Sequence, residues 1–218
     1  MGKKPRKPGK SRRKTKSGQP TPDRVIDAAL ALAAAAGWRQ LGLDQIAAEA
    51  GLTLAELRSV FPSKAAILTG FVRRTDERVL AGGKAGDEDG DGTARDRLFD
   101  VLMRRFDVLQ PDRSAVRAII RDSLCDPLAV LCQGPMLLCS MASMLEAAGL
   151  SSTGLNGALR TKGLALVYLV ALRAWLKDDS TDLAKTMAVL DRGLRQAEKM
   201  AAFLNSGRTA KAGRPKEA

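Results

Sequence analysis

The chain has no histidine, only three cysteines and few aromatic side chains. Without histidine it lacks the commonest metal ligand and general base, and no serine or cysteine has a plausible base to activate it. On one continuous helix Cys125, Cys132 and Cys139 would lie about 10.5 Å apart, too far to share a zinc ion. We therefore expect no catalytic site, metal or cofactor, although acid chemistry by Asp or Glu stays open. The cysteines are expected to be small core residues.

Acidic residues are missing from residues 1–16, which hold nine Lys and Arg. Residues 205–218 add three net positive charges, and the total is +12, so residues 17–204 are balanced. Both ends are rich in Pro, Gly and Ser and are expected to be disordered, as an arm over 1–21 and a tail over 205–218. Basic segments attract DNA, RNA and anionic lipid alike. The arm residues assigned to non-specific contacts are Lys10, Arg12, Arg13, Lys14 and Lys16.

Long apolar runs are also missing. No segment has the roughly 18 uninterrupted apolar residues of a membrane-spanning helix, and the basic N-terminus lacks the apolar stretch of a secretory signal. We expect a cytoplasmic protein. Nearly every segment between the ends has helical periodicity and none alternates as a strand does, so the predicted fold class is all-α.

Four helices are predicted over residues 22–81. The first ends at Gly37, the second spans 43–50 before Gly51, the third spans 54–60 and the fourth spans 63–81. Thr53 is a fitting N-cap for the third helix, with Glu56 completing a capping box. The second and third helices have the layout of a helix-turn-helix. Its packing residues are Ile46, Ala47, Ala50, Leu52, Leu57 and Phe61.

A glycine-rich acidic linker is predicted over residues 82–93. Its "DEDGDG" matches the opening of a calcium-binding loop, but the twelfth position, which must be Glu, is Leu98. We therefore expect a solvated linker without calcium.

A larger helical domain is predicted over residues 94–204. The apolar run from Leu124 to Leu150 is punctuated by Pro127 and Pro135, which predicts a short helix followed by a longer one. The last helix carries apolar residues at steps of four and three, a seam that packs against another helix. A homodimer interface is favoured over an internal contact. The seam consists of Leu183, Met187, Leu190, Leu194 and Ala197.

The first four helices, with the motifs "GW", "IAAEAGLT" and "FPSK", resemble the TetR family of bacterial repressors over about residues 22–80. This resemblance implies a DNA-binding head and a helical ligand-binding and dimerisation domain. The protein would bind double-stranded operator DNA as a homodimer and respond to a small apolar ligand. By the same resemblance, the residues that contact DNA would be Arg39, Thr53, Leu54, Arg58, Ser59 and Lys64.

The contact positions depart from the family pattern. Glu56 places a negative charge on the helix that would face phosphates, and Arg58 stands where the family usually has Tyr. Arg58 could donate to a phosphate or read guanine as a bidentate fork. Residues 23–80 hold seven basic and seven acidic side chains, so affinity for DNA would depend on the arm.

Residues 94–204 also resemble the lipid-binding proteins of coenzyme Q biosynthesis. This resemblance implies an alternative function, an accessory protein that binds isoprenoid lipid at a membrane surface and no longer reads DNA. The acidic stretch from Asp178 to Asp182 has a second interpretation that involves no lipid: it forms a turn and an N-cap for the last helix. The residues that carry the resemblance are Trp175, Asp179, Ser180, Asp182, Thr186, Leu190, Asp191 and Arg192.

Overall fold

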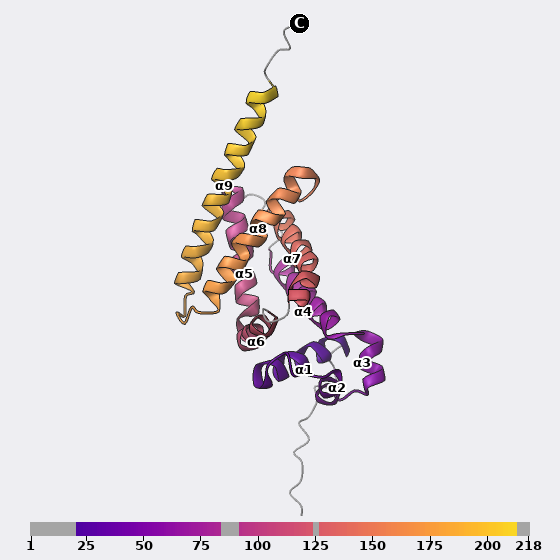
Figure 1. Cartoon of the computed structure of the whole chain (residues 1–218). Helices are drawn as coiled ribbons and strands as arrows, with labels where there is room; N and C mark the ends of the chain where they lie inside the picture. The colour runs from indigo at the N-terminus through magenta and orange to yellow at the C-terminus, as the bar shows by residue number, and fades with distance from the viewer. Residues whose placement is uncertain (1–20, 84–91, 124–126, 213–218) are drawn as a thin grey trace, which may run out of the picture.

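The computed structural model describes residues 21–83, 92–123 and 127–212, with only the backbone of 127–132 and 202–212. All regular structure in these ranges is helical, which confirms the predicted all-α class (Figure 1). The helices are α1 (Thr21–Ala36), α2 (Leu43–Ala50), α3 (Leu54–Val60), α4 (Lys64–Ala81), α5 (Ala94–Leu109), α6 (Arg113–Ser123), α7 (Pro127–Ala147), α8 (Gly154–Trp175) and α9 (Ala184–Ala212), with a 3₁₀ turn, η2 (Gln110–Asp112), between α5 and α6.

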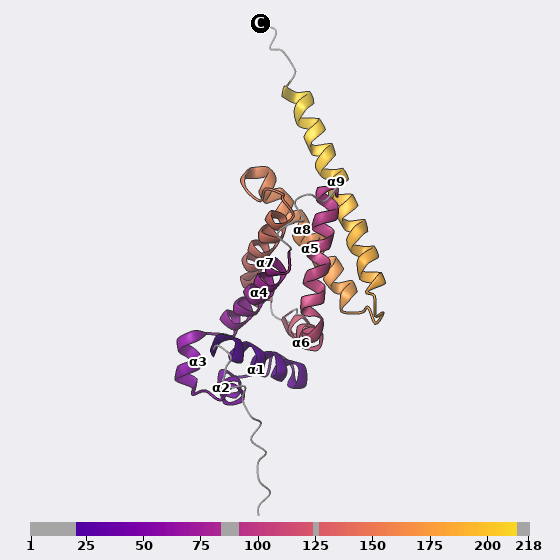
Figure 2. The ribbon, with the colours of Figure 1, turned by 180° about the vertical axis from the view of Figure 1, so that it is seen from behind.

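The helices form two groups, a head of α1–α3 and a body of α5–α9. Figures 1 and 2 show the head at one end of the molecule, with α4 running from it into the body. α4 packs against α1 in the head and against α5 and α7 in the body, and α6 packs on α1. The orientation of the head is therefore set by α4 and by the contact between α1 and α6.

The first four helices agree with the sequence prediction to within one residue at each end. One face of α1 is buried throughout, and its apolar residues follow the spacing of a core-facing helix. Its residues are Val25, Ile26, Ala29, Leu30 and Ala33.

The prediction of two helices between Leu124 and Leu150 is wrong, because α7 continues through Pro135. A proline disfavours helix in the residue before it by contacting that residue's Cβ. Here the preceding residue is Gly134, which has no Cβ and so avoids this contact with the proline ring. Cys139 on this helix is exposed, so its assignment to the core is also wrong. Cys125 and the side chain of Cys132 lie outside the described residues.

The apolar seam of α9 belongs to the protomer's own core. Leu183, Leu190 and Leu194 are buried, and α9 packs along α8 and against α5. A Cβ on Gly193 would lie 2.8 Å from Cγ1 of Val167, so the two helices approach closely only because this residue is glycine. These leucines are covered within one chain, so their assignment to a homodimer interface is wrong.

A buried ion pair ties α4 to the body. The guanidinium of Arg105 on α5 bonds to the carboxylate of Asp76 on α4, and its Nε donates to the Tyr168 hydroxyl at 3.2 Å. The Ser140 hydroxyl on α7 donates to the same Asp76 oxygen at 2.9 Å. Because breaking one partner of a buried pair leaves an uncompensated charge, the network holds α4, α5, α7 and α8 in one arrangement.

Asp178 caps the start of α9. Its buried carboxylate accepts the Thr186 N–H and hydroxyl at 2.8 Å each and the Ser180 N–H at 3.2 Å. Burial alone would raise the pKa of Asp178, but the bonds from Ser180 and Thr186 outweigh it and hold the pKa far below its usual range. Ser180 in turn accepts the Ala184 N–H at 3.2 Å. The predicted turn and N-cap are thus confirmed in this stretch.

The substitution Asp178→Ala is expected to lower the free energy of unfolding by about 3 kcal/mol, because it leaves buried donors without an acceptor. Thermal denaturation should show a melting temperature lower by about 6–12 °C. Since the pKa of the folded state is depressed, this stabilisation is complete above about pH 4 and is lost as the pH falls. Asp179→Ala is the control, because that side chain is 91% exposed; equal melting of the two variants would contradict the cap.

Candidate nucleic-acid interface

α2 and α3 meet at a tight turn. Gly51 ends α2 with φ +68, in the left-handed region that favours glycine, and the Leu52 N–H donates to the Ala47 carbonyl at 2.9 Å. From α1, a guanidinium nitrogen of Arg24 donates to the Ala50 carbonyl at 2.5 Å. The inner faces of both helices are buried. This is the helix-turn-helix arrangement that the sequence predicted, with α3 as its outer helix.

Phe61 anchors the end of α3 against α4. A Cβ on Gly70 would lie 2.7 Å from Cε1 of Phe61, so this glycine of α4 leaves the room that the ring occupies. The role of Gly70 was not predictable from sequence, because a glycine inside a helix gives no sign of which side chain fills the space.

The capping box of α3 is confirmed and gives Glu56 a defined role. The Glu56 carboxylate accepts the Thr53 N–H at 2.7 Å and the Thr53 hydroxyl at 2.8 Å, and the Thr53 oxygen accepts the Glu56 N–H. The bond from the Thr53 N–H lowers the pKa of Glu56, with a further contribution from the Thr53 hydroxyl. The carboxylate expected to face phosphates is therefore turned back onto the N-cap, and the Thr53 hydroxyl is engaged there as well.

The outer face of α3 presents Leu54, Arg58 and Ser59. Leu54 is 42% exposed, so it places a large apolar side chain on this face. Arg58 is exposed and makes no hydrogen bond or ion pair with the described residues. The Ser59 hydroxyl donates to the Glu56 carbonyl at 2.7 Å, so its proton is used within the helix. Leu54 and Arg58 are thus the side chains available to a ligand on this face.

Lys64 makes an internal contact rather than pointing freely outward. Its Nζ donates to the Trp38 carbonyl at 2.7 Å, lies 3.4 Å from the Arg39 carbonyl and sits 4.9 Å from the centre of the Trp38 ring. Desolvation of the half-buried ammonium lowers its pKa. Lys64 therefore supports the turn between α1 and α2, and its contact with the DNA backbone stays a prediction.

That turn is also held from the body. Oδ2 of Asp122, on α6, accepts the backbone N–H groups of Trp38 at 2.7 Å and of Arg39 at 2.9 Å. The bond from the Arg39 backbone lowers the pKa of Asp122, followed by the bond from Arg121. The Arg39 side chain is exposed and has no partner among the described residues. Asp122 was missed by the sequence analysis, because no local pattern relates it to a turn 84 residues earlier.

Several predicted features lie outside the described residues. These are the arm contacts Lys10, Arg12, Arg13, Lys14 and Lys16, the centre of the linker at 84–91, and the end of the basic tail at 213–218. Residues 205–212, which were predicted to belong to the disordered tail, instead continue α9 to Ala212, so the prediction is wrong for this part.

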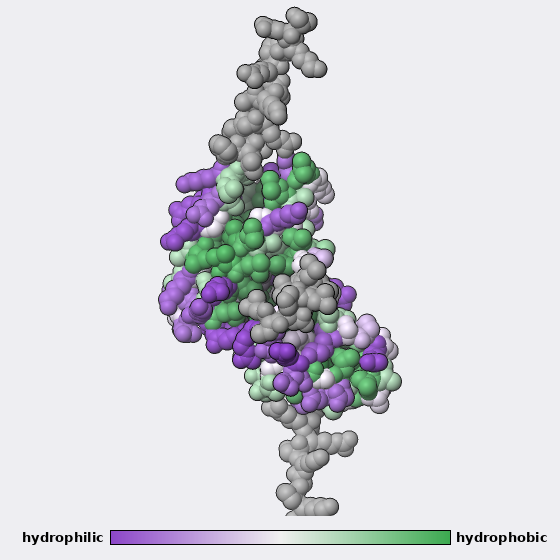
Figure 3. Space-filling view, in the orientation of Figure 1, coloured by the Kyte–Doolittle hydropathy of each residue, from purple (hydrophilic) through white to green (hydrophobic). Residues whose placement is uncertain are grey.

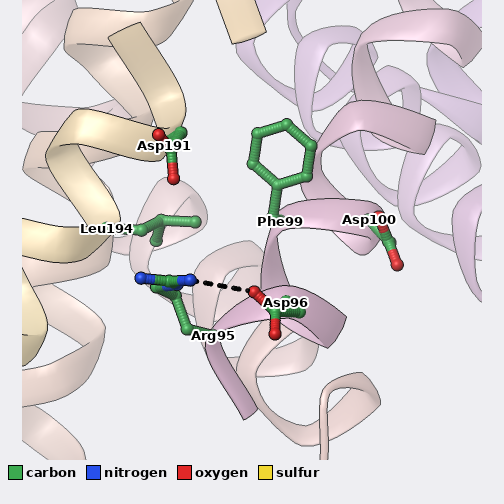
Figure 4. A pocket seen from close by; sticks show the side chains of 6 residues that line it. All are labelled: Arg95, Asp96, Phe99, Asp100, Asp191 and Leu194. Carbon is green, nitrogen blue, oxygen red and sulfur yellow. Dashed lines mark hydrogen bonds and ion pairs between the residues drawn. The ribbon is translucent and has the colours of Figure 1, made fainter. Parts of the chain in front are cut away.

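One cavity of about 330 Å³ opens between α5 and α9. Figure 4 shows Phe99 and Leu194 on facing helices, with the Arg95 guanidinium directed at Asp96. Asp100 and Asp191 complete the lining, so four of its six residues are charged. This cavity gives no specific support to the small apolar ligand that the TetR resemblance implied.

Among the described residues, α8 is long and apolar enough to cross a membrane by length and composition alone. About a third of this stretch is buried inside the protein, and α8 buries Tyr168 and Trp175 against Phe106 of α5. Arg160, Lys162 and Arg173 interrupt it, as the absence of an unbroken apolar run indicated.

The comparisons with known proteins agree with this geometry. Residues 25–70 match the family "Bacterial regulatory proteins, tetR family". A TetR transcriptional regulator from Nitrosomonas europaea is similar in structure, with 26% identity and a TM-score of 0.67 over 83% of this chain and 99% of the other. A TetR transcriptional regulator from Rhodococcus sp. RHA1 shares the fold, at 20% identity and a TM-score of 0.58 over 81% and 94%.

No protein of curated function matches the chain in sequence, and the resemblance of residues 94–204 to coenzyme Q lipid-binding proteins gains no support from these comparisons. The matched segment spans α1 to the first part of α4, and it includes the turn and the outer helix described above. Residues 25–70 thus match the tetR-family N-terminal model, and the all-helical fold is similar to that of the TetR regulator from Nitrosomonas europaea.

Proposed function

We propose that this protein is a cytoplasmic transcriptional regulator that binds operator DNA as a homodimer through α3. The observation that carries the proposal is the division of α3 into a buried inner face, held by Leu57, and an exposed outer face, formed by Leu54 and Arg58. A helix whose inner side packs against α1 and α2 is free to enter the major groove with its outer side.

The two exposed side chains suit different base edges. An arginine fork can donate to O6 and N7 of guanine, and an apolar side chain can contact the methyl group of thymine. Leu54 and Arg58 are four residues apart, which is about 6 Å along a helix and close to two base-pair steps of about 3.4 Å. We therefore expect each half-site to contain a guanine and a thymine about two steps apart.

The substitution Arg58→Ala tests this reading. On a duplex chosen by selection from a randomised pool, it should weaken binding by about 1–3 kcal/mol and relax the preference at one base pair, measured by fluorescence anisotropy. Arg73→Ala is the matched control, because Arg73 is an exposed arginine of α4 that pairs with Glu77. An equal loss on all sequences would make Arg58 a phosphate contact, and no loss would remove it from the interface.

A second copy of the chain is the proposed partner of α8. Figure 3 shows apolar side chains gathered over α8 in the middle of the body. Leu155, Leu159, Leu166 and Val170 are spaced by four, seven and four residues, so they form one stripe, and each is more than half exposed. A stripe of this kind on a soluble protein indicates an interface, and an isologous dimer matches the two-fold symmetry of a palindromic operator.

The lipid-binding alternative retains one observation in its favour, which is the same exposed stripe of α8. Residues that carried the resemblance have structural roles instead. Trp175 is buried with Nε1 donating to Gln110 at 2.9 Å, Thr186 bonds to Asp178, and Leu190 lies in the core. Native mass spectrometry with organic extraction separates the two functions, since the regulator is expected to purify without isoprenoid lipid.

A further inference from the structure

We propose that Asp122 is a positioning residue that locks the head to the body and thereby sets the separation of the two α3 helices in the dimer. This proposal rests on the proposed function. It assigns to Asp122 the orientation of α3, the helix proposed to read DNA.

The geometry of the lock is specific. One oxygen of the Asp122 carboxylate lies within 2.9 Å of two successive backbone nitrogens, those of Trp38 and Arg39. Its other oxygen accepts from Nε of Arg121 at 3.0 Å, which orients the carboxylate toward the turn. Bonds from N–H groups to an ionised carboxylate are about twice as strong as neutral ones.

The backbone conformation of the turn and the space beside it fit this carboxylate. Gly37 has φ +86, and a Cβ there would lie 3.2 Å from Oδ2 of Asp122, so glycine supplies both the backbone conformation and the space. On the carbonyl side, Lys64 donates to Trp38 and covers its ring. The backbone N–H groups of the segment from Gly37 to Arg39 thus bond to the carboxylate of Asp122 on α6. The backbone carbonyls of the same segment bond to the ammonium of Lys64 on α4.

Only a few residues separate the turn that Asp122 holds from the helix-turn-helix. Residues 40–42 alone separate the held segment from the first residue of α2, and α2 packs on α3. A dimeric reader requires a fixed distance between its two recognition helices, about one helical turn of DNA. Without the lock, α4 and the packing of α1 on α6 still join head and body in the part of the chain that the structure describes. The head should then adopt a wider range of orientations while each α3 remains intact.

The first test needs no DNA. In the full chain, hydrogen exchange by mass spectrometry should show the amides of Trp38 and Arg39 exchanging at least about tenfold faster in Asp122→Ala than in the wild type. Asp122→Asn keeps the volume and one acceptor oxygen, so it should restore part of the protection. Asp107→Ala, at an exposed aspartate of α5, is the control. Unchanged exchange in Asp122→Ala would overturn the lock.

The second test uses duplexes whose two half-sites are separated by spacers that differ by single base pairs. The wild type should bind one spacing most tightly. In Asp122→Ala, the ratio of the affinity for this spacing to the affinity for the others should fall about tenfold, while the affinity for an isolated half-site stays unchanged. A spacing profile identical to the wild type's would overturn the positioning role. If the wild type binds no duplex specifically, the proposed function fails, whereas the exchange experiment still decides whether Asp122 locks the head.

Discussion

Removal of residues 1–20 is expected to lower the affinity for every DNA duplex by at least about tenfold and to flatten the dependence of affinity on salt. The reason is the distribution of charge. Residues 23–80 are balanced, with seven basic and seven acidic side chains, whereas residues 1–16 carry nine positive charges and no negative ones. Each phosphate contact that is lost should reduce the slope of log K against log salt by about 0.9.

The measurement is a titration by fluorescence anisotropy between about 50 and 200 mM salt, with the operator and with an unrelated duplex. A variant that keeps the length of the arm but replaces Lys10, Arg12, Arg13, Lys14 and Lys16 by Gln controls for length. Both variants should retain the ratio of specific to non-specific affinity, because arm contacts to phosphates carry no sequence information. Unchanged affinity and slope would show that the balanced head binds DNA without the arm.

The substitution Leu166→Glu is expected to convert the dimer to a monomer and to weaken operator binding by at least about 100-fold, because two linked half-site contacts become independent. Leu166 is 67% exposed and lies in the centre of the α8 stripe, so the folded protomer should tolerate glutamate there. Dimer formation would bury the carboxylate of the new glutamate without a partner, which disfavours the dimer. Light scattering coupled to size-exclusion chromatography measures the mass of the particle.

Leu80→Glu is the matched control for this experiment. Leu80 is an exposed leucine of α4, 45% accessible, outside the α8 stripe, so its replacement should leave the dimer intact. A dimer that survives Leu166→Glu would contradict the proposed interface. Loss of binding to liposomes in the same variant, from a wild type that is monomeric, would show that α8 meets lipid rather than a second chain.

Local signals explain which parts of the fold were predictable from sequence. The bounds of α1 to α4 follow from capping residues, glycines and apolar spacing, all of which act within a few residues. The continuous α7 was not predicted, because the usual effect of Pro135 depends on the residue before it, and Gly134 removes the clash. The seam of α9 was correctly seen as apolar, but periodicity does not tell which helix covers it, and α8 of the same chain does.

In the candidate site, too, the local contacts were predictable from sequence and the contacts between distant residues were not. The Thr53 and Glu56 cap was predictable because its partners are three residues apart. The contacts of Lys64 with Trp38 and of Asp122 with Arg39 join residues 26 and 83 positions apart, and such contacts appear only once the helices are packed together. Lys64 thus supports the turn, while its contact with a phosphate stays a prediction, and the local capping box relieves the conflict that Glu56 posed for DNA binding.

The ratio of affinities for two duplexes tests the central proposal most directly. One is the sequence enriched from a randomised pool by the full-length protein, and the other has the same bases in scrambled order. At physiological salt, the account predicts an enriched inverted repeat that is bound at least about 1,000-fold more tightly than the scrambled duplex. Enrichment of no sequence, or equal affinity for the two duplexes, would contradict it.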